Sequence, residues 1–258
     1  MNYLILDPSQ KTNSGEFKIS NQDRIVHILK VLQKKEGDKI KSGLLNDSLG
    51  IFKILKITPQ EILGSYTPII KPKRRSPGIN LIVSVQRPPT VEKILELAGV
   101  WGVQSLEFRL ATLSRTEYLT SPVWKEENIK EKLILGMEQG GNVFLPKLDL
   151  GFVPPGKNIP FEKKQSISER VSSPQTFLYL DKKGKFIQEF LPLEEKEYSI
   201  LVGPEPGWTK TELEIFRKYN IPGVRLSSSV LRSEQAVSFF LSQWENSVSR
   251  LEGQRIRK

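Results

Sequence analysis

The sequence predicts a two-domain α/β protein in which a small β-rich domain precedes a larger domain built on a parallel sheet. Apolar and charged residues alternate in residues 39–41 and 51–57, as they do in half-buried strands. From residue 80 onward, short apolar runs alternate with helical patterns, which is typical of a parallel sheet. Residues 71–78 combine Pro, Gly and four positive charges with no apolar residue, which marks a linker. We therefore expect domains at residues 1–70 and 79–258.

Composition narrows the classes of partner and chemistry. Lys and Arg number 39 against 29 Asp and Glu, a net charge of +10 that favours a polyanion, and nucleic acid before a membrane. The absence of cysteine excludes disulfides and thiolate sites, and a single histidine argues against a metal site. The N-terminal apolar run is too short for a signal peptide, and no run approaches about 18 apolar residues. We therefore expect a cytoplasmic protein without a membrane partner.

One helix is expected in the first domain. Ser20 or Asn21 can cap it, and a turn at Gly37 and Asp38 ends it. At about 100° per residue, His27 lies opposite the apolar face and is predicted to be exposed. The apolar face comprises Ile25, Ile28, Leu29 and Leu32.

The second domain is predicted to alternate strands and helices. Pro88 and Pro89 should break the first strand, and Thr90 can cap the helix that follows. Residues 147–172 are polar and rich in Pro and Gly, so we expect a loop with one short helix near 166–171. The other expected elements are strands at 80–85, 105–108, 176–180 (ending at Asp181), 199–202 and 224–226, and helices at 90–98, 127–139 and 233–251.

A rigid loop follows the predicted strand at residues 199–202. Residues 203–207 read Gly-Pro-Glu-Pro-Gly, which cannot continue a strand. Thr209 and Glu212 then form a capping-box pattern that opens a helix. Ligands of open α/β sheets bind beyond the carboxyl ends of strands, so this loop is a candidate site, although an ordinary connection has the same pattern.

A second stretch, residues 224–236, shifts the balance toward a functional site. Leu226, Val230, Leu231, Arg232 and Glu234 follow the first motif at a spacing that resembles the RsmE family of 16S rRNA uridine-N3 methyltransferases, in the SPOUT superfamily. The family has GPEGG in the loop, followed by L-G-x-R-[IV]-L-R-x-E-T-A. This chain departs from the two patterns at Pro206, Ser227, Ser229 and Gln235.

The resemblance implies a fold, a cofactor and partners. It implies a C-terminal SPOUT domain with a trefoil knot, a PUA-like RNA-binding β-barrel at the N-terminus, and S-adenosylmethionine as methyl donor. The implied partners are 16S rRNA of the small ribosomal subunit and a second copy of the chain, since each site in the family is completed across a two-fold interface. The implied cofactor-binding residues are Leu178, Tyr179, Leu180, Gly203, Pro204, Glu205, Gly207, Leu226, Ser227, Ser229, Val230 and Leu231.

Methylation of uracil N3 requires loss of the imide proton and stabilisation of the resulting negative charge. Arg232 is the candidate for stabilising that charge or orienting a phosphate. Glu234 or Glu205 could act as the base or hold Arg232 by an ion pair. Arg232 and Glu234 could equally form a structural salt bridge, and Glu205 could serve the helix dipole. The candidate RNA-binding residues are His27, Lys30, Lys73, Arg74, Arg75 and Arg115.

Two alternatives stay open on the sequence. Gln33 and Asn142 stand where the family has arginines, as does Ser229. These replacements would suit a non-catalytic RNA-binding protein on the same fold, or a methyltransferase that acts on a different RNA.

Overall fold

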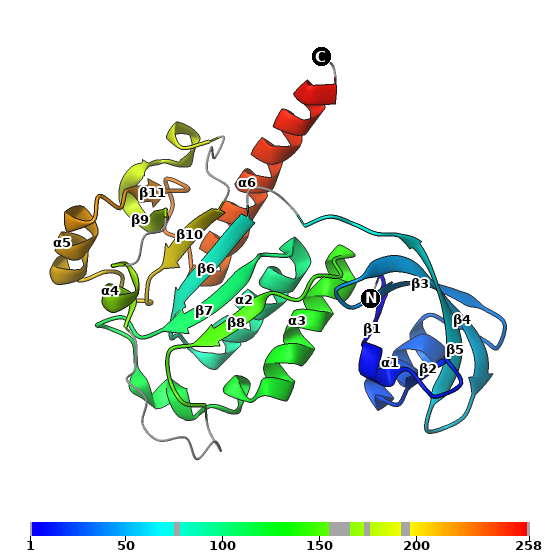
Figure 1. Ribbon diagram of the computed structural model, residues 1–258. Helices are drawn as coiled ribbons and strands as arrows, with labels where there is room; N and C mark the ends of the chain where they lie inside the picture. The colour runs from blue at the N-terminus through cyan, green and yellow to red at the C-terminus, as the bar shows by residue number, and fades with distance from the viewer. Residues whose placement is uncertain (1, 75–77, 155–165, 173–175, 192–196, 257–258) are drawn as a thin grey trace.

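The computed structural model describes residues 2–74, 78–154, 166–172, 176–191 and 197–256, with the side chains of α6 described only to residue 247. It contains two separate sheets. Figure 1 shows them side by side, with the long C-terminal helix projecting from the second. Both parts of the expected α/β class are therefore present.

The first sheet, here the N-terminal sheet, has the order β1-β3-β4-β5-β2 and is antiparallel except for the β1–β3 pair. It curls around the helix α1 (Gln22–Val26), whose Ile25 is buried in the sheet's core together with Ile28 (Figure 1). The expected β-rich character is confirmed, but β1, β2 and β5 lacked an alternating pattern strong enough to predict. The strands are β1 Leu4–Leu6, β2 Phe17–Ile19, β3 Lys39–Leu44, β4 Ser48–Ile57 and β5 Ile62–Ile70.

The expected first helix is shorter than its apolar pattern suggested. Asn21, rather than Ser20, caps it, because the Asn21 side chain accepts a hydrogen bond from the Arg24 backbone N–H at 3.0 Å. A π-helical turn follows at His27–Val31. The helical segment ends before Gln33, whose φ of 52° lies in the left-handed region. His27 is half-buried, and its Nε2 is buried without a hydrogen-bond partner, so the prediction of an exposed histidine was wrong.

The second sheet, here the C-terminal sheet, is wholly parallel, with the order β11-β9-β10-β6-β7-β8. Short connecting helices lie between its strands: η3 (Thr116–Thr120), η4 (Pro122–Trp124) and η5 (Ile187–Glu189). Its strands are β6 Gly78–Ser84, β7 Ser105–Arg109, β8 Lys147–Leu150, β9 Phe177–Phe186, β10 Glu197–Val202 and β11 Gly223–Arg225. Its helices are α2 Pro88–Trp101, α3 Glu126–Gly140, α4 Ile167–Arg170, α5 Lys210–Lys218 and α6 Ser233–Ile256.

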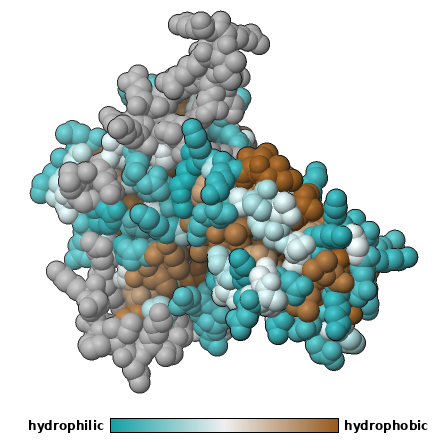
Figure 2. Space-filling model, turned by 45° about the vertical axis from the view of Figure 1, so that its right-hand side comes forward, coloured by the Kyte–Doolittle hydropathy of each residue, from teal (hydrophilic) through white to brown (hydrophobic). Residues whose placement is uncertain are grey.

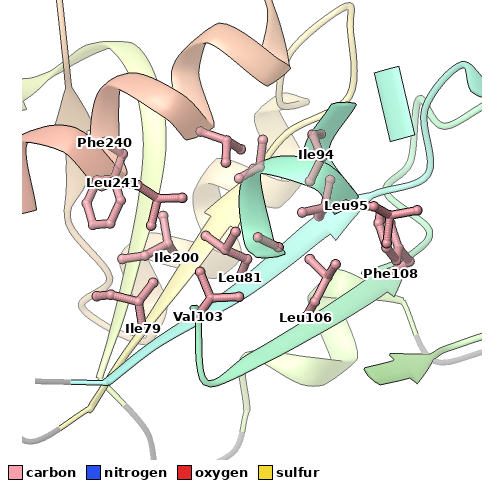
Figure 3. Close-up of a cluster of buried hydrophobic side chains, with 14 of the residues drawn as sticks. Ile79, Leu81, Ile94, Leu95, Val103, Leu106, Phe108, Ile200, Phe240 and Leu241 are labelled. Carbon is pink, nitrogen blue, oxygen red and sulfur yellow. The ribbon is translucent and has the colours of Figure 1, made fainter. Parts of the chain in front are cut away.

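Helices cover both faces of this sheet. On one face, α2, α3 and α6 bury the largest core, and Figure 3 shows Phe240 and Leu241 of α6 lying against Ile79 and Ile200 of the sheet. On the other face, α4 and α5 bury a smaller cluster that includes Phe216. Because both faces are covered, the strands read as continuous apolar runs, which is why several of them could be found in the sequence.

Three predicted elements need correction. Pro88 and Pro89 do not separate a strand from a later helix cap; they occupy the first turn of α2, where a missing N–H costs nothing. The segment expected to be loop begins with the edge strand β8, whose residues are largely exposed. β9 does not end at Asp181 but resumes after an irregularity, since Gly223 pairs with Tyr179 and Val224 with Lys185.

A buried charge joins the two sheets. Glu138, near the end of α3, accepts a backbone hydrogen bond from Ile5 of β1 at 3.2 Å and forms a 2.9 Å salt bridge with Arg24 of α1. Burial raises the pKa of Glu138, although Arg24 and the Ile5 N–H act against that rise. Lys130 of α3 also pairs with Asp7 at 2.5 Å. The first sheet is thus held to α3 by polar contacts from at least two segments.

Candidate functional site

The carboxyl ends of β9, β10 and β11 meet at one edge of the C-terminal sheet, because β10 and β11 both pair in parallel with β9. The loop after β10 makes a tight turn in which the Gly207 N–H donates to the Pro204 carbonyl at 2.8 Å. Gly207 has a φ of +89°, a conformation that other residues rarely adopt. The two predicted motifs are therefore brought to one edge, as expected for the ends of neighbouring parallel strands.

Side chains from two other segments hold this loop in place. Gln86, which follows β6 and is 1% exposed, donates from Nε2 to the Gly203 carbonyl at 3.0 Å. Arg87 places Nε 3.0 Å from Glu205. Trp208 donates from Nε1 to the Leu180 carbonyl at 3.0 Å, which ties the loop to β9. The loop is thus fixed before any ligand binds, so a ligand meeting it would pay little to order it.

Gly203 is packed against another residue of the same loop. A Cβ on Gly203 would lie 2.9 Å from the indole of Trp208, so the glycine makes room for that ring. A larger residue at Gly203 would therefore collide first with Trp208.

The helix after the loop begins as predicted. Thr209 is the N-cap of α5 and Glu212 completes the capping box, with the Thr209 N–H donating to Glu212 Oε2 at 2.8 Å. The sequence did not indicate that the other oxygen of the buried Glu212 accepts a hydrogen bond from the Thr112 backbone N–H at 2.9 Å. One side chain therefore both starts α5 and fixes the segment that follows β7.

The second motif lies between β11 and α6. Leu226 is buried and Leu231 is half-buried against the main core, whereas Ser229 and Val230 are exposed, Val230 at 78%. The Ser229 N–H donates to Ser227 Oγ at 3.1 Å. Apolar anchors thus hold both ends of a loop whose middle is open to solvent.

The candidate catalytic carboxylates pair with cations that the sequence analysis did not single out. Glu205 pairs with Arg87, and this contact raises the pKa of Arg87. Glu234 pairs with Lys93 of α2 at 3.6 Å. Arg232 is exposed and forms no salt bridge with a residue in the described part of the chain. Of the options left open for the two carboxylates, the structure shows neither of them holding Arg232, because Arg87 at the start of α2 and Lys93 within it pair with them instead.

The described members of the predicted RNA-binding set lie in different settings. Lys30 and Lys73 are exposed, and Arg115 lies 3.9 Å from Glu117. Arg74 packs its guanidinium 4.8 Å from the centre of the Phe144 ring and donates to the Leu145 carbonyl at 3.4 Å, so it fixes the linker. Arg75 lies outside the described residues.

Gln86, Arg87 and Trp208 were missed by the sequence analysis. A signal existed for Gln86 and Arg87, since they directly follow a predicted buried strand, and the ends of parallel strands share one edge. Gln86 Oε1 is buried without a partner and lies beside the loop. This orphan acceptor and the fixed backbone groups suit a ligand with amino groups, as expected for an adenosine-containing cofactor.

The described residues contain no cluster of three side chains able to hold a metal ion. Among the same residues, we find no helix with the length and apolar character needed to cross a bilayer.

Comparison with known proteins places these features in context. Residues 74–245 match a family described as RNA methyltransferase domain. The chain is similar to ribosomal RNA small subunit methyltransferase E 1 of Borreliella burgdorferi, with 26% identity over 86% of this chain and 90% of that protein. It is also similar to ribosomal RNA small subunit methyltransferase E of Treponema pallidum, with 23% identity over 92% of this chain and 87% of that protein.

Two solved structures share the fold. One is a putative methyltransferase from Legionella pneumophila in complex with bound SAM (TM-score 0.72, 16% identity, covering 95% of this chain and 98% of that chain). The other is a ribosomal RNA small subunit methyltransferase E from Neisseria gonorrhoeae bound to S-adenosyl methionine (TM-score 0.70, 17% identity, covering 95% and 97%). At this identity the likeness concerns the fold.

Proposed function

Since the chain belongs to the RNA methyltransferase family, in its RsmE branch, we propose that it transfers a methyl group to N3 of a uridine in 16S rRNA. The chain is an S-adenosylmethionine-dependent rRNA methyltransferase. Family membership over residues 74–245 carries this conclusion. It favours the enzyme over the non-catalytic RNA-binding alternative, and the names of the two spirochaete relatives support the small-subunit target.

The loops at the carboxyl ends of β9, β10 and β11 would hold the methyl donor. Backbone groups of residues 178–180, 203–207 and 226–231 would bind the adenosine, with the Gly203 carbonyl oriented by Gln86. When bound, S-adenosylmethionine supplies an electrophilic methyl group. The chain's own contribution is to hold these loops rigid, since Trp208 and Arg87 each anchor the loop after β10.

Arg232 would stabilise the negative charge that develops on the uracil. It is exposed, and no described carboxylate pairs with it, so its guanidinium can turn toward an incoming anion. Glu205 and Glu234 are better suited to positioning, because each anchors one motif to a cation, Arg87 or Lys93. We therefore assign charge stabilisation to Arg232 and anchoring of the two motifs to Glu205 and Glu234, which the ion pairs with Arg87 and Lys93 support.

The finer architecture follows from the family. We propose that residues 79–258 form a SPOUT domain with a trefoil knot, that residues 1–70 form a PUA-like RNA-binding barrel, and that residues 71–78 link them. The parallel sheet and the curled N-terminal sheet support this assignment. The expectation of a cytoplasmic enzyme stays a prediction.

A transfer assay tests the proposal. Purified protein, labelled S-adenosylmethionine and 30S particles that lack the modification should give label in 16S rRNA, and mapping should place it on N3 of one uridine. Label on another base, or in a different RNA only, would contradict the proposed target. Calorimetric binding of S-adenosylmethionine, measured alongside, separates a wrong target from an inactive protein.

A further inference from the structure

We propose that the outer face of the N-terminal sheet is the surface on which the RNA backbone docks. This inference rests on the proposed function, since it assumes that the substrate is RNA. The strands alternate buried and exposed residues, so every second side chain faces away from α1 and the core. The charged residues on that outer face are all basic: Lys18 of β2, Lys39 and Lys41 of β3, and Lys53 and Lys56 of β4.

Strand register gathers these lysines into adjacent rows. Lys39 pairs directly with Lys53, which pairs on its other side with Ser65. An irregularity in β4 between Ile54 and Lys56 turns Lys56 onto the same face as Lys53. Lys56 and Lys18 thereby pair with the same residue of β5, Leu63, from opposite sides. The cations therefore lie on one face of the sheet, on β3, β4 and β2, with uncharged residues of β5 between Lys18 and the other four.

This arrangement costs stability in the absence of a partner. Like charges that lie directly opposite in a sheet, as Lys39 and Lys53 do, repel each other. Within the described part of the chain, no salt bridge neutralises Lys39, Lys41, Lys53 or Lys56, while Lys18 pairs with Glu61 at 3.2 Å. A bound polyanion would relieve the repulsion and release counterions, which favours binding.

Glu61 pairs with Lys18 of this face, and two further carboxylates lie at the ends of its strands. Glu36 Oε1 accepts a hydrogen bond from the Ile57 backbone N–H at 2.8 Å, and Asp38 Oδ2 accepts one from the Lys35 N–H at 2.8 Å. Glu36 and Asp38 hold the chain where β3 begins and β4 ends, and within the described residues neither forms a salt bridge with a lysine of the face.

The face suits RNA better than a membrane surface. It adds the hydroxyl groups of Ser65 and Thr67, which can donate to phosphate oxygens. The most exposed apolar side chain of the face in β3 and β4 is Leu55, at 41%, while Ile69 and Ile70 at the end of β5 are 65% and 58% exposed. The strands of this sheet expose no aromatic side chain for insertion into lipid. Figure 2 shows hydrophilic residues over much of the visible surface of this part of the molecule, with hydrophobic patches between them.

The surface differs from the one that the sequence suggested. His27 and Lys30 belong to the segment that packs on the inner side of the curled sheet, and His27 Nε2 is buried. The outer lysines were visible in the sequence only as alternating strand residues, because their grouping depends on strand order and on the irregularity in β4.

The test removes the patch while keeping the fold. In the full chain, Lys39, Lys41, Lys53 and Lys56 are changed to Gln, and four exposed lysines of the C-terminal region, Lys125, Lys182, Lys183 and Lys218, are changed to Gln as a control with the same charge change. Binding to purified 16S rRNA fragments is measured as a function of salt. The patch variant should lose at least about tenfold in affinity near 0.1 M salt, and its log–log salt slope should fall by about 2 to 3, since each lost contact to a single strand removes ~0.7.

An equal effect of both variants, or a wild-type slope in the patch variant, would overturn the proposal. Wild-type binding to vesicles rich in anionic lipid that is lost in the patch variant, with RNA binding retained, would assign the face to membranes instead. Calorimetry with S-adenosylmethionine should give the same affinity for the patch variant and wild type. Failure of wild type to bind S-adenosylmethionine would count against the proposed function. The RNA affinities of wild type and the two variants could still be compared, because that measurement does not need the cofactor.

Discussion

At the scale of single residues, the candidate site depends on side chains that act on backbone groups. Gln86 orients the Gly203 carbonyl, Trp208 holds the Leu180 carbonyl, and Glu212 holds the Thr112 N–H. Sequence patterns reveal a cap such as Thr209 because its partner is three residues away. They do not reveal Gln86, whose partner is 117 positions away in the chain. Long-range contacts of this kind depend on strand order.

Arg232 provides the sharpest residue-level prediction. Arg232→Met should lower the rate of methyl transfer by about 10²-fold or more, because a fixed cation aimed at developing charge typically supplies that much. Affinity for S-adenosylmethionine should stay unchanged, since the proposed site holds the methyl donor with the backbone of the loops and not with Arg232. Single-turnover transfer and calorimetry measure the two quantities.

Arg217→Met, which removes an exposed arginine of α5, is the matched control and should leave transfer unchanged. A parallel loss of cofactor affinity in Arg232→Met would instead place Arg232 in the cofactor site.

At the scale of elements, the structure departs from the sequence where geometry overrides a local pattern. The apolar stripe from Ile25 to Leu32 predicts a regular helix, but the chain forms one short α-helix and then a π-helical turn. The prolines at 88 and 89 indicate a break, but at a helix start they complete the first turn of α2. Local patterns therefore located these elements, and packing decided their ends.

The 3₁₀ helix η1 (Pro8–Gln10) offers a prediction about pH, because its cap is also an inter-sheet ion pair. Asp7 accepts the Ser9 N–H at 2.9 Å and pairs with Lys130 of α3. Burial acts to raise the pKa of Asp7, but the bonds from Lys130 and Ser9 outweigh it and lower the pKa from 3.8 to about 2. When a carboxyl has a lower pKa in the folded protein than in the unfolded protein, its ionised form stabilises the fold. This stabilisation is complete at pH values above the pKa of the unfolded protein. The contribution of Asp7 should therefore fade as the pH drops from about 4 to about 2.

Urea unfolding at a series of pH values tests this expectation. Asp7→Asn can still accept the Ser9 N–H but carries no charge, so wild type should be the more stable protein at pH 6 and the difference should vanish near pH 2. A difference that stays constant over this range would show that the charge of Asp7 is not responsible. Taking the difference between the two proteins cancels the titration of Glu138, whose raised pKa acts in the opposite direction.

At the scale of the whole molecule, the sequence predicted the α/β class and both motifs of the candidate site. Continuous apolar runs identified β6, β7 and β10, because both faces of the parallel sheet are covered. The exposed edge strand β8 lacked such a run, and the pairing of α2 with both motifs through Arg87 and Lys93 could not be inferred without the sheet order. The two motifs were recognisable because each is a continuous stretch of sequence. Arg87 and Lys93, which pair with them, lie far from them in the sequence and were not recognised.

We also predict that the protein is a homodimer. The main reason is the distribution of apolar side chains on the C-terminal helix α6. Phe240 and Trp244 of α6 are buried against the sheet, whereas Phe239 is 48% exposed, so α6 has apolar residues on two sides. Phe186, 38% exposed, lies on the segment that reaches α6 through the Gln188–Gln243 hydrogen bond of 3.0 Å. A two-fold contact would cover these side chains, and such contacts are the commonest in homo-oligomers.

Light scattering at micromolar concentration should therefore give about twice the chain mass of 29.4 kDa. Phe239→Lys should shift the mass toward the monomer and lower methyl transfer, because the proposed site needs residues from both copies. Leu135→Lys, which alters an apolar residue of α3 that is 44% exposed, should leave both unchanged. A wild-type mass near 29.4 kDa in a sample that still transfers methyl groups would show that one chain forms the whole site, and Arg232 would then have to reach the uridine without help from a neighbour.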